Sequence, residues 1–268
     1  MLKHRLITGL ILLLLTISAV IFLPIPYFIG LVSLVMLLAA WEWARLIAYQ
    51  RWYTRLGYVA LVAVMMILEW YAPIVPVLLA TLVWWFIAYY WVLKYPGAKQ
   101  VWSNGVWVRG IMGILVLVPA WLSLNVLRYA EHGRALIFFL FVLVWASDIG
   151  AYFVGKTWGK RQFMSLVSPK KTVEGFVGGF LCALLVAWIA STMGVFSLSN
   201  GFMIIVLGAV VSLFAILGDL LESMVKRSAG VKDTGHYLPG HGGLLDRIDS
   251  LLAAAPIFLL GLILLNSL

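Results

Sequence analysis

The sequence predicts an all-α polytopic membrane protein of about nine transmembrane helices, with the N-terminus cytoplasmic and the C-terminus outside. Three observations lead to this fold class: the composition, a series of long apolar runs, and the placement of the basic residues. Of the 268 residues, 64% are hydrophobic and 11% are charged, whereas a soluble domain carries about 25% charged residues. So few charges cannot cover a water-exposed surface, and the excess apolar side chains must face lipid.

Nine apolar runs each approach the length of about 20 residues that crosses a bilayer. The first follows the basic stretch Lys3–Arg5 and reaches Pro24 without a small-residue cleavage site, which indicates a retained membrane helix rather than a signal peptide. The short turn at Ala72-Pro73 predicts a tight helical hairpin of the third and fourth runs. The runs cover residues 6–23, 27–47, 56–72, 74–93, 108–127, 134–155, 173–195, 201–221 and 249–267.

The basic residues test this count, because cytoplasmic loops of membrane proteins are enriched in Lys and Arg. With the N-terminus inside, only Arg128 and Arg134 of the 19 Lys and Arg residues fall outside. Removing one span would invert every later segment and destroy this asymmetry. The net charge of +9 therefore reflects membrane topology, and no basic run favours nucleic-acid binding. The single cysteine, Cys182, excludes an intrachain disulfide and a cysteine metal site.

The acidic residues are distributed unequally along the chain. Residues 1–127 contain only Glu42 and Glu69, and the other acidic residues lie in 128–268. We therefore interpret residues 1–127 as a scaffold of transmembrane helices. Residues 128–268 are interpreted as a transmembrane catalytic region with its site on the cytoplasmic face.

The first polar segment of this region starts with Asp148, which lies within an apolar run. A lone carboxylate in lipid costs at least about 2.5 kcal/mol, so Asp148 is expected to face a cavity. Further on, Ser168-Pro169 predicts a helix start, with Ser as N-cap and Pro at the first helical position. Lys170 and Lys171 would then stand at a positive helix N-terminus, a combination that attracts phosphate. The alternative is an ordinary basic cluster that holds acidic lipid headgroups.

The residues that follow favour more than a basic cluster. Glu174 adds a carboxylate beside the two lysines, and Gly175, Gly178 and Gly179 add small residues. Gly175 and Gly179 also fit a small-xxx-small helix-packing face, which is a purely structural use.

The second polar segment begins near the cytoplasmic end of a membrane helix. Asp219 and Glu222 are three residues apart and share a helix face, as do Asp246 and Asp249 at the start of the last helix. Four carboxylates from two helices are thus expected to converge at one membrane interface. Oxygen ligands of this kind suit Mg²⁺, which takes one or two carboxylates and completes its shell with water and phosphate.

Cations accompany these carboxylates, namely Lys226, Arg227, Lys232 and Arg247. Carboxylates for a metal together with cations for phosphate oxygens are what phosphoryl chemistry needs. The glycine-rich stretch 240–243 lets the backbone approach and cradle an anion. The alternative is a solvated loop with internal salt bridges, such as one between Glu222 and Lys226.

The segment from Ser223 to Asp249 resembles the signature of the phosphatidate cytidylyltransferase family. The matching residues are Lys226-Arg227, Lys232-Asp233, Gly240-His241-Gly242-Gly243 and Asp246-Arg247-Ile248-Asp249. The stretches 148–152 and 168–175 resemble further family segments. The resemblance implies transfer of the cytidylyl group of CTP to phosphatidic acid, dependence on Mg²⁺, and a homodimer in the bilayer. It also implies a bacterial cytoplasmic membrane.

The resemblance and the chemistry together give a hypothesis for the site. Asp219 and Asp246 hold the metal, and Lys170 and Lys171 position one phosphate. Whether a second, monovalent ion joins the metal is left open. No strong base is required, because a phosphate monoester is already anionic at neutral pH. The predicted catalytic residues are Asp219, Lys226, Arg227, Asp246, Arg247 and Asp249, and the predicted substrate-binding residues are Asp148, Lys170, Lys171, Glu174, Ser223, Lys232, Asp233, His241, Gly242 and Gly243.

Two other functions compete with this prediction. A CTP-dependent kinase of a membrane lipid alcohol would also bind CTP and metal, but it needs a base for a hydroxyl and yields CDP. An ion-coupled transporter would use the intramembrane acids as an ion path. Transporter sites lie near the midplane, often within inverted repeats, whereas these charges lie at the predicted interface and no repeat is visible.

Overall fold

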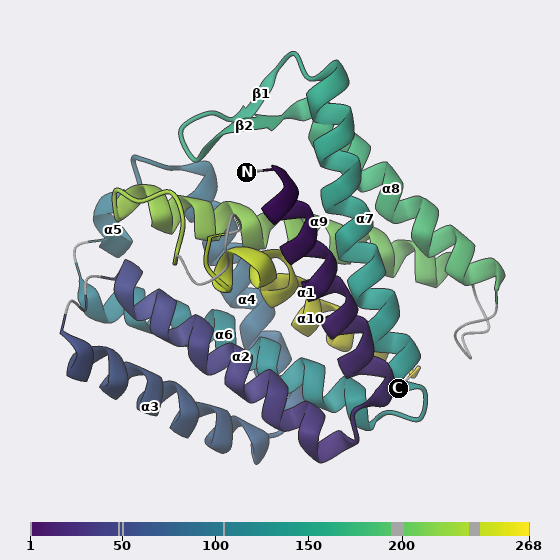
Figure 1. The fold of residues 1–268 in the computed structure, drawn as a ribbon, viewed down its shortest axis with the longest axis horizontal. Coiled ribbons are helices and arrows are strands. Elements are labelled where there is room, and N and C mark those ends of the chain that lie inside the picture. The colour runs from purple at the N-terminus through teal and green to yellow at the C-terminus, as the bar shows by residue number, and fades with distance from the viewer. Residues whose placement is uncertain are drawn as a thin grey trace.

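The computed structural model describes residues 2–47, 49, 51–103, 105–193, 201–235 and 242–267, with side chains from residue 7 onward. The chain forms a bundle of long helices with one small two-stranded hairpin (Figure 1). In chain order the elements are α1 (Leu2–Phe22), α2 (Ile25–Leu46), α3 (Trp52–Trp70), α4 (Ile74–Leu93), α5 (Lys99–Ser103), α6 (Val106–Tyr129), α7 (Gly133–Trp158), β1 (Gln162–Met164), β2 (Ser168–Thr172), α8 (Val173–Thr192), α9 (Gly201–Ser228) and α10 (Leu245–Leu264).

The long helices correspond one to one with the nine predicted runs, which confirms the all-α polytopic class. Among the described residues, the eight helices α2, α3, α4, α6, α7, α8, α9 and α10 are long and apolar enough to cross a membrane. The described apolar part of α1, Ile7–Phe22, is shorter than such a span. Large apolar side chains are exposed along these helices, for example Leu61 and Ile67 of α3 and Leu181 and Leu185 of α8. This exposure suits surfaces that face lipid.

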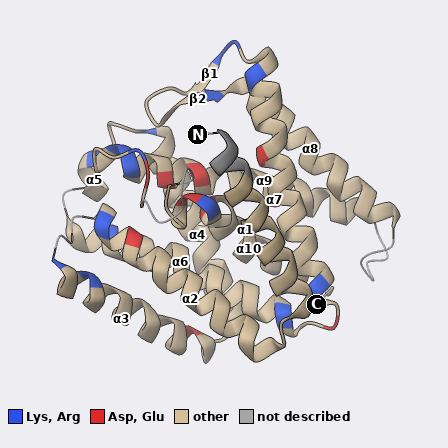
Figure 2. Ribbon diagram, viewed as in Figure 1, with Lys and Arg blue, Asp and Glu red and all other residues tan. Residues whose placement is uncertain are grey.

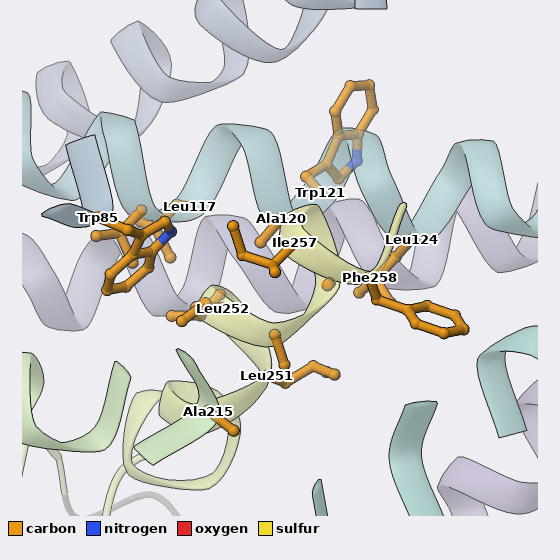
Figure 3. Packing of buried hydrophobic residues seen from close by; sticks show 14 of the residues in the cluster. Trp85, Leu117, Ala120, Trp121, Leu124, Ala215, Leu251, Leu252, Ile257 and Phe258 are labelled. Carbon is orange, nitrogen blue, oxygen red and sulfur yellow. The ribbon is translucent and has the colours of Figure 1, made fainter. Parts of the chain in front are cut away.

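Helix α10 lies in the core of the bundle and packs against α4, α6, α7 and α9. Figure 3 shows its side chains Leu252 and Phe258 among residues of α4, α6 and α9, including Trp85, Leu117 and Ala215. All five are almost fully buried. Because α10 is buried from Ser250 to Leu260, its first turn is attached to a closely packed segment.

Helices α7 and α8 approach each other closely through small residues. A Cβ atom on Gly175 would lie 2.8 Å from the carbonyl oxygen of Ala151, and one on Gly179 would lie 2.5 Å from that of Ser147. Any larger side chain would push the helices apart. The small-xxx-small packing face predicted for Gly175 and Gly179 is therefore confirmed.

The predicted helix start at Ser168-Pro169 is wrong. Residues Ser168–Thr172 form strand β2, which pairs antiparallel with β1. Helix α8 begins only at Val173, and its N-cap is Thr172, whose hydroxyl accepts a hydrogen bond from the Gly175 amide at 3.0 Å. Both Ser168 and Thr172 are good N-cap residues. Because residues 168–172 pair with β1, the helix starts after Thr172 rather than after Ser168. Lys170 and Lys171 thus lie on a strand, one to two residues before the N-cap.

The tight hairpin predicted for the third and fourth runs is also wrong. The turn between Trp70 and Ile74 is short, as expected. Nevertheless, α3 packs mainly against α2 and α6, whereas α4 packs against α6, α9 and α10. A short turn keeps the ends of two helices close together, but each helix packs where other helices offer an apolar surface.

Candidate functional site

A cavity of about 930 Å³ lies between α7, α8, the β1–β2 hairpin, α9 and α10. Charged segments gather near the meeting of α9 and α10, as Figure 2 shows. Four helix carboxylates line the cavity: Asp148 from α7, Asp219 from α9, and Asp246 and Asp249 from α10. The other predicted site residues in its wall are Lys170, Lys171, Ser223, Lys226, Arg227, Lys232, Asp233 and Arg247.

Strand β2 brings one cation directly to helix α9. Lys171 Nζ lies 2.6 Å from Asp219 Oδ2, and both side chains are 28% exposed. The other oxygen, Asp219 Oδ1, accepts a long hydrogen bond of 3.3 Å from the Ser223 hydroxyl one turn later. The hairpin therefore delivers a lysine into the cavity, although it reaches the site from a strand rather than from a helix N-terminus.

Lys226 of α9 contacts two carboxylates, Glu222 on its own helix and Asp246 on α10. Its Nζ lies 2.6 Å from Asp246 Oδ1 and 3.0 Å from Glu222 Oε1. Glu222 and Lys226 stand one helical turn apart on α9, so the pair predicted as the structural alternative is present. Glu222 is only 3% exposed and lies outside the cavity lining. Of the four carboxylates expected to converge, Glu222 therefore serves to pair Lys226 rather than to face a ligand.

The second oxygen of Asp246 organises the loop before α10. Asp246 Oδ2 accepts hydrogen bonds from the Thr234 amide at 2.9 Å, the Thr234 hydroxyl at 2.9 Å and the Gly243 amide at 2.8 Å. Gly242 has a φ of +81°, a conformation that favours glycine. Asp246 thus acts as the centre of a network that fixes the loop, in addition to facing the cavity.

Three predicted substrate-binding residues lie elsewhere. Glu174 accepts hydrogen bonds from the amides of Lys160 at 3.0 Å and Arg161 at 3.1 Å, and it lines a separate groove of about 400 Å³ beside α7 and α8. Gly242 and Gly243 support the loop but do not line the cavity. His241 lies outside the described residues.

One residue with a direct connection to the site was missed by sequence reasoning, namely Glu42 of α2. It is 2% exposed, and its carboxylate accepts hydrogen bonds from the amides of Leu244 and Leu245. Its Oε2 also shares the single hydrogen of the Thr234 hydroxyl with Asp246 Oδ2. A lone carboxylate within an apolar run was a usable signal, because the same reasoning singled out Asp148. The interpretation of residues 1–127 as scaffold assigns Glu42 no part in the site.

The donor set fits Mg²⁺ in part. Among the described residues, no three Asp, Glu, His or Cys side chains form a preformed metal cage. Mg²⁺ does not need one, since it takes one or two carboxylates plus water and phosphate. Asp219 fits this role best, because its side chain is accessible from the cavity and only Lys171 and Ser223 occupy its oxygens. Asp246 has both oxygens engaged by the protein.

The fold and the site together define a polytopic membrane protein with a cavity suited to phosphate groups, because carboxylates and cations face one another in its wall. A family model described as the cytidylyltransferase family matches residues 3–265. The chain belongs to the cytidylyltransferase family.

Similar proteins that are named phosphatidate cytidylyltransferases support the family assignment. A phosphatidate cytidylyltransferase of Pseudomonas aeruginosa is 44% identical over 261 residues, which cover 96% of each chain. One of Haemophilus influenzae is 34% identical over 283 aligned positions, covering 96% of this chain and 97% of the relative. One of Bacillus subtilis is 46% identical over 134 residues, about half of each chain. For the first two relatives, the similarity covers 96% of this chain and so includes residues 1–127 as well as the site.

Proposed function

We propose that this chain catalyses the phosphatidate cytidylyltransferase reaction, in which CTP and phosphatidic acid give CDP-diacylglycerol and pyrophosphate. The observation that carries the proposal is the cavity where Asp148, Asp219 and Asp249 face lysines and arginines contributed by the hairpin, α9 and α10. Family membership and the names of the relatives agree with it.

The reaction is an in-line displacement at phosphorus. A phosphate oxygen of phosphatidic acid attacks the α-phosphorus of CTP, and a new P–O bond forms. The bond to the oxygen that bridges the α- and β-phosphates breaks, and pyrophosphate leaves with that electron pair. No base has to act on the acceptor, because a phosphate monoester carries between one and two negative charges near pH 7 (second pKa about 6).

The cations of the cavity have two distinct roles in this reaction. Lys170, Lys232 and Arg247 line the cavity, and in this proposal they bind phosphate oxygens of the two substrates. They are distinct from the buried triad of Lys226, Glu222 and Asp246. Lys226 is almost fully buried, and its contact with Asp246 links α9 to α10. A cation fixed in this way stabilises developing charge without reorganising.

We also propose that Mg²⁺ serves the site, with Asp219 as its first ligand and Asp246 or Asp249 of α10 as the second. When bound there, Mg²⁺ would supply positive charge that neutralises the phosphate groups of the substrates. Lys171 is paired with Asp219, so a cation bound there would free this lysine for a phosphate.

The remaining assignments follow from the family resemblance and from charge placement. We propose the bacterial cytoplasmic membrane as the location, with the cavity facing the cytoplasm, where CTP is available. A homodimer is proposed as the assembly.

The function is tested by pyrophosphate release from the purified protein. With CTP and phosphatidic acid, pyrophosphate and CDP-diacylglycerol should form in equal amounts. The matched control replaces phosphatidic acid by diacylglycerol, the alcohol that a lipid kinase would phosphorylate. Turnover of diacylglycerol with release of CDP, and none of phosphatidic acid, would overturn the proposal.

A further inference from the structure

Within the described residues, no side chain close in sequence caps the N-terminus of helix α10. The N-cap position is Leu244, and no side-chain capping hydrogen bond is made there. The first amides of a helix have no partner within the helix and must find one elsewhere when they are buried. At α10 the partner comes from α2: Glu42 Oε1 accepts from the Leu244 amide at 2.9 Å, and Glu42 Oε2 accepts from the Leu245 amide at 2.7 Å.

The loop before α10 is shaped around this carboxylate. A Cβ atom on Gly235 would lie 2.4 Å from Glu42 Oε1, and one on Gly243 would lie 2.5 Å from Glu42 Oε2. Only glycine fits at both positions without displacing the carboxylate. Two separate parts of the signature segment, residues 223–249, therefore pack directly on a side chain about 200 residues away in sequence.

One hydroxyl connects Glu42 with the cavity carboxylate Asp246. Thr234 Oγ1 lies 2.9 Å from Glu42 Oε2 and 2.9 Å from Asp246 Oδ2. Thr234 is fully buried, so water does not compete for this link. The contact makes a continuous path from α2 through the loop to the first turn of α10.

We propose that Glu42 is a positioning residue for the reaction. It holds the first turn of α10 so that Asp246, Arg247 and Asp249 face the cavity, and it acts through Asp246 rather than by touching substrate. The positive end of α10 and two amide donors stabilise the negative charge of Glu42 in its buried position. This role rests on the proposed function, because it assigns Glu42 to the same site.

Glu42→Gln is the direct test, since it keeps the size but replaces one acceptor oxygen by a donor NH₂. The turnover number per folded protein should fall about 10- to 100-fold, as for other residues that orient a reacting group. The KM for CTP should change little, because Glu42 does not contact the nucleotide. Glu69→Gln, the other acidic residue of 1–127, is the matched control and should keep wild-type turnover. Normal turnover of folded Glu42→Gln would overturn the proposal.

A double-mutant cycle separates positioning from simple stabilisation of the fold. If Glu42 acts through Asp246, adding Glu42→Gln to Asp246→Asn should cost little further turnover. Multiplicative losses would contradict the path. Thr234→Ser, which keeps the hydroxyl, should retain activity that Thr234→Val loses, and equal activity in both would also contradict it.

A measurement without substrate distinguishes failure of this proposal from failure of the proposed function. Hydrogen–deuterium exchange of the peptide 242–250 should be faster in Glu42→Gln than in the wild type, because the Leu244 and Leu245 amides lose acceptors. Unchanged exchange would refute the positioning role even if the enzyme is active. If exchange is faster in Glu42→Gln but the wild-type chain forms no CDP-diacylglycerol, the contact is supported and the proposed function is refuted instead.

Discussion

Replacing Lys226 with methionine removes the cation that contacts both Glu222 and Asp246. The side chains of Lys226, Glu222 and Asp246 are 10%, 3% and 5% exposed, respectively. Methionine keeps most of the apolar stem of lysine but carries no charge. Two buried carboxylates would then remain without the ammonium that pairs them.

The size of the effect follows from this burial. Removing one partner of a buried ion pair costs about 3–5 kcal/mol of unfolding free energy, because an uncompensated charge is left in the interior. That is a large share of the roughly 5–15 kcal/mol that stabilises a typical folded protein. Turnover should fall as well, since Asp246 loses the contact that fixes its Oδ1.

The assay is unfolding of the purified protein by denaturant in detergent, together with CDP-diacylglycerol formation. Lys226→Arg keeps the charge and should lose less stability than Lys226→Met. Adding Glu222→Gln to Lys226→Met removes one of the two stranded charges and should restore part of the loss. The matched control is Arg161→Gln, which breaks a pair with Glu174 at 3.4 Å in which the Arg161 side chain is 78% exposed. Solvent-exposed pairs contribute little, so an equal effect of Lys226→Met and Arg161→Gln would refute the buried triad.

The remaining predictions concern the cavity and the topology. Asp246→Asn should lower turnover at least about 100-fold while the protein still inserts and purifies, because it removes the charge opposite Lys226 and from the proposed metal site; near-normal turnover would remove Asp246 from the reaction. Reporter fusions after Leu268 and within residues 226–240 should report opposite sides of the membrane, with the latter cytoplasmic; the same side for both would contradict the nine-helix topology.

Most of the fold could be predicted because membrane helices are specified locally. A run of about 20 apolar residues has few alternatives to a helix in lipid, and each predicted run became a helix. Apolar runs specify helix ends less well, because a helix can continue into water: α9 ends at Ser228, beyond the apolar run that ends at residue 221. The β1–β2 hairpin was not predicted, because its pairing depends on two short polar stretches that carry no hydrophobic period.

The site residues that a motif or helical spacing marks were predicted, and those that depend on packing between helices were not. Asp219 and the pair Asp246 and Asp249 were found from helical spacing and sequence motif, and all three line the cavity. Spacing alone does not say which face of a helix meets a neighbour. Glu174 is predicted to bind substrate and instead pairs with protein groups. For Glu222 the structure shows the alternative, its pair with Lys226.

Glu42 illustrates the strongest limit of sequence reasoning in this chain. Its contacts are with residues about 200 positions later. No periodicity or spacing connects such distant segments, and only the packing of α2 beside the start of α10 brings them together. The division into a scaffold, 1–127, and a catalytic region, 128–268, stays a prediction, although the scaffold contributes a buried carboxylate to the support of the site.

Following the label of CTP into lipid tests the proposed transfer most directly. With ³²P at the α position, radioactivity should appear in chloroform-extractable lipid, because the cytidylyl group itself moves to phosphatidic acid. With ³²P at the γ position, the label should remain water-soluble and appear as pyrophosphate. Lipid labelled only from the γ position would contradict cytidylyl transfer and identify a CTP-dependent lipid kinase instead.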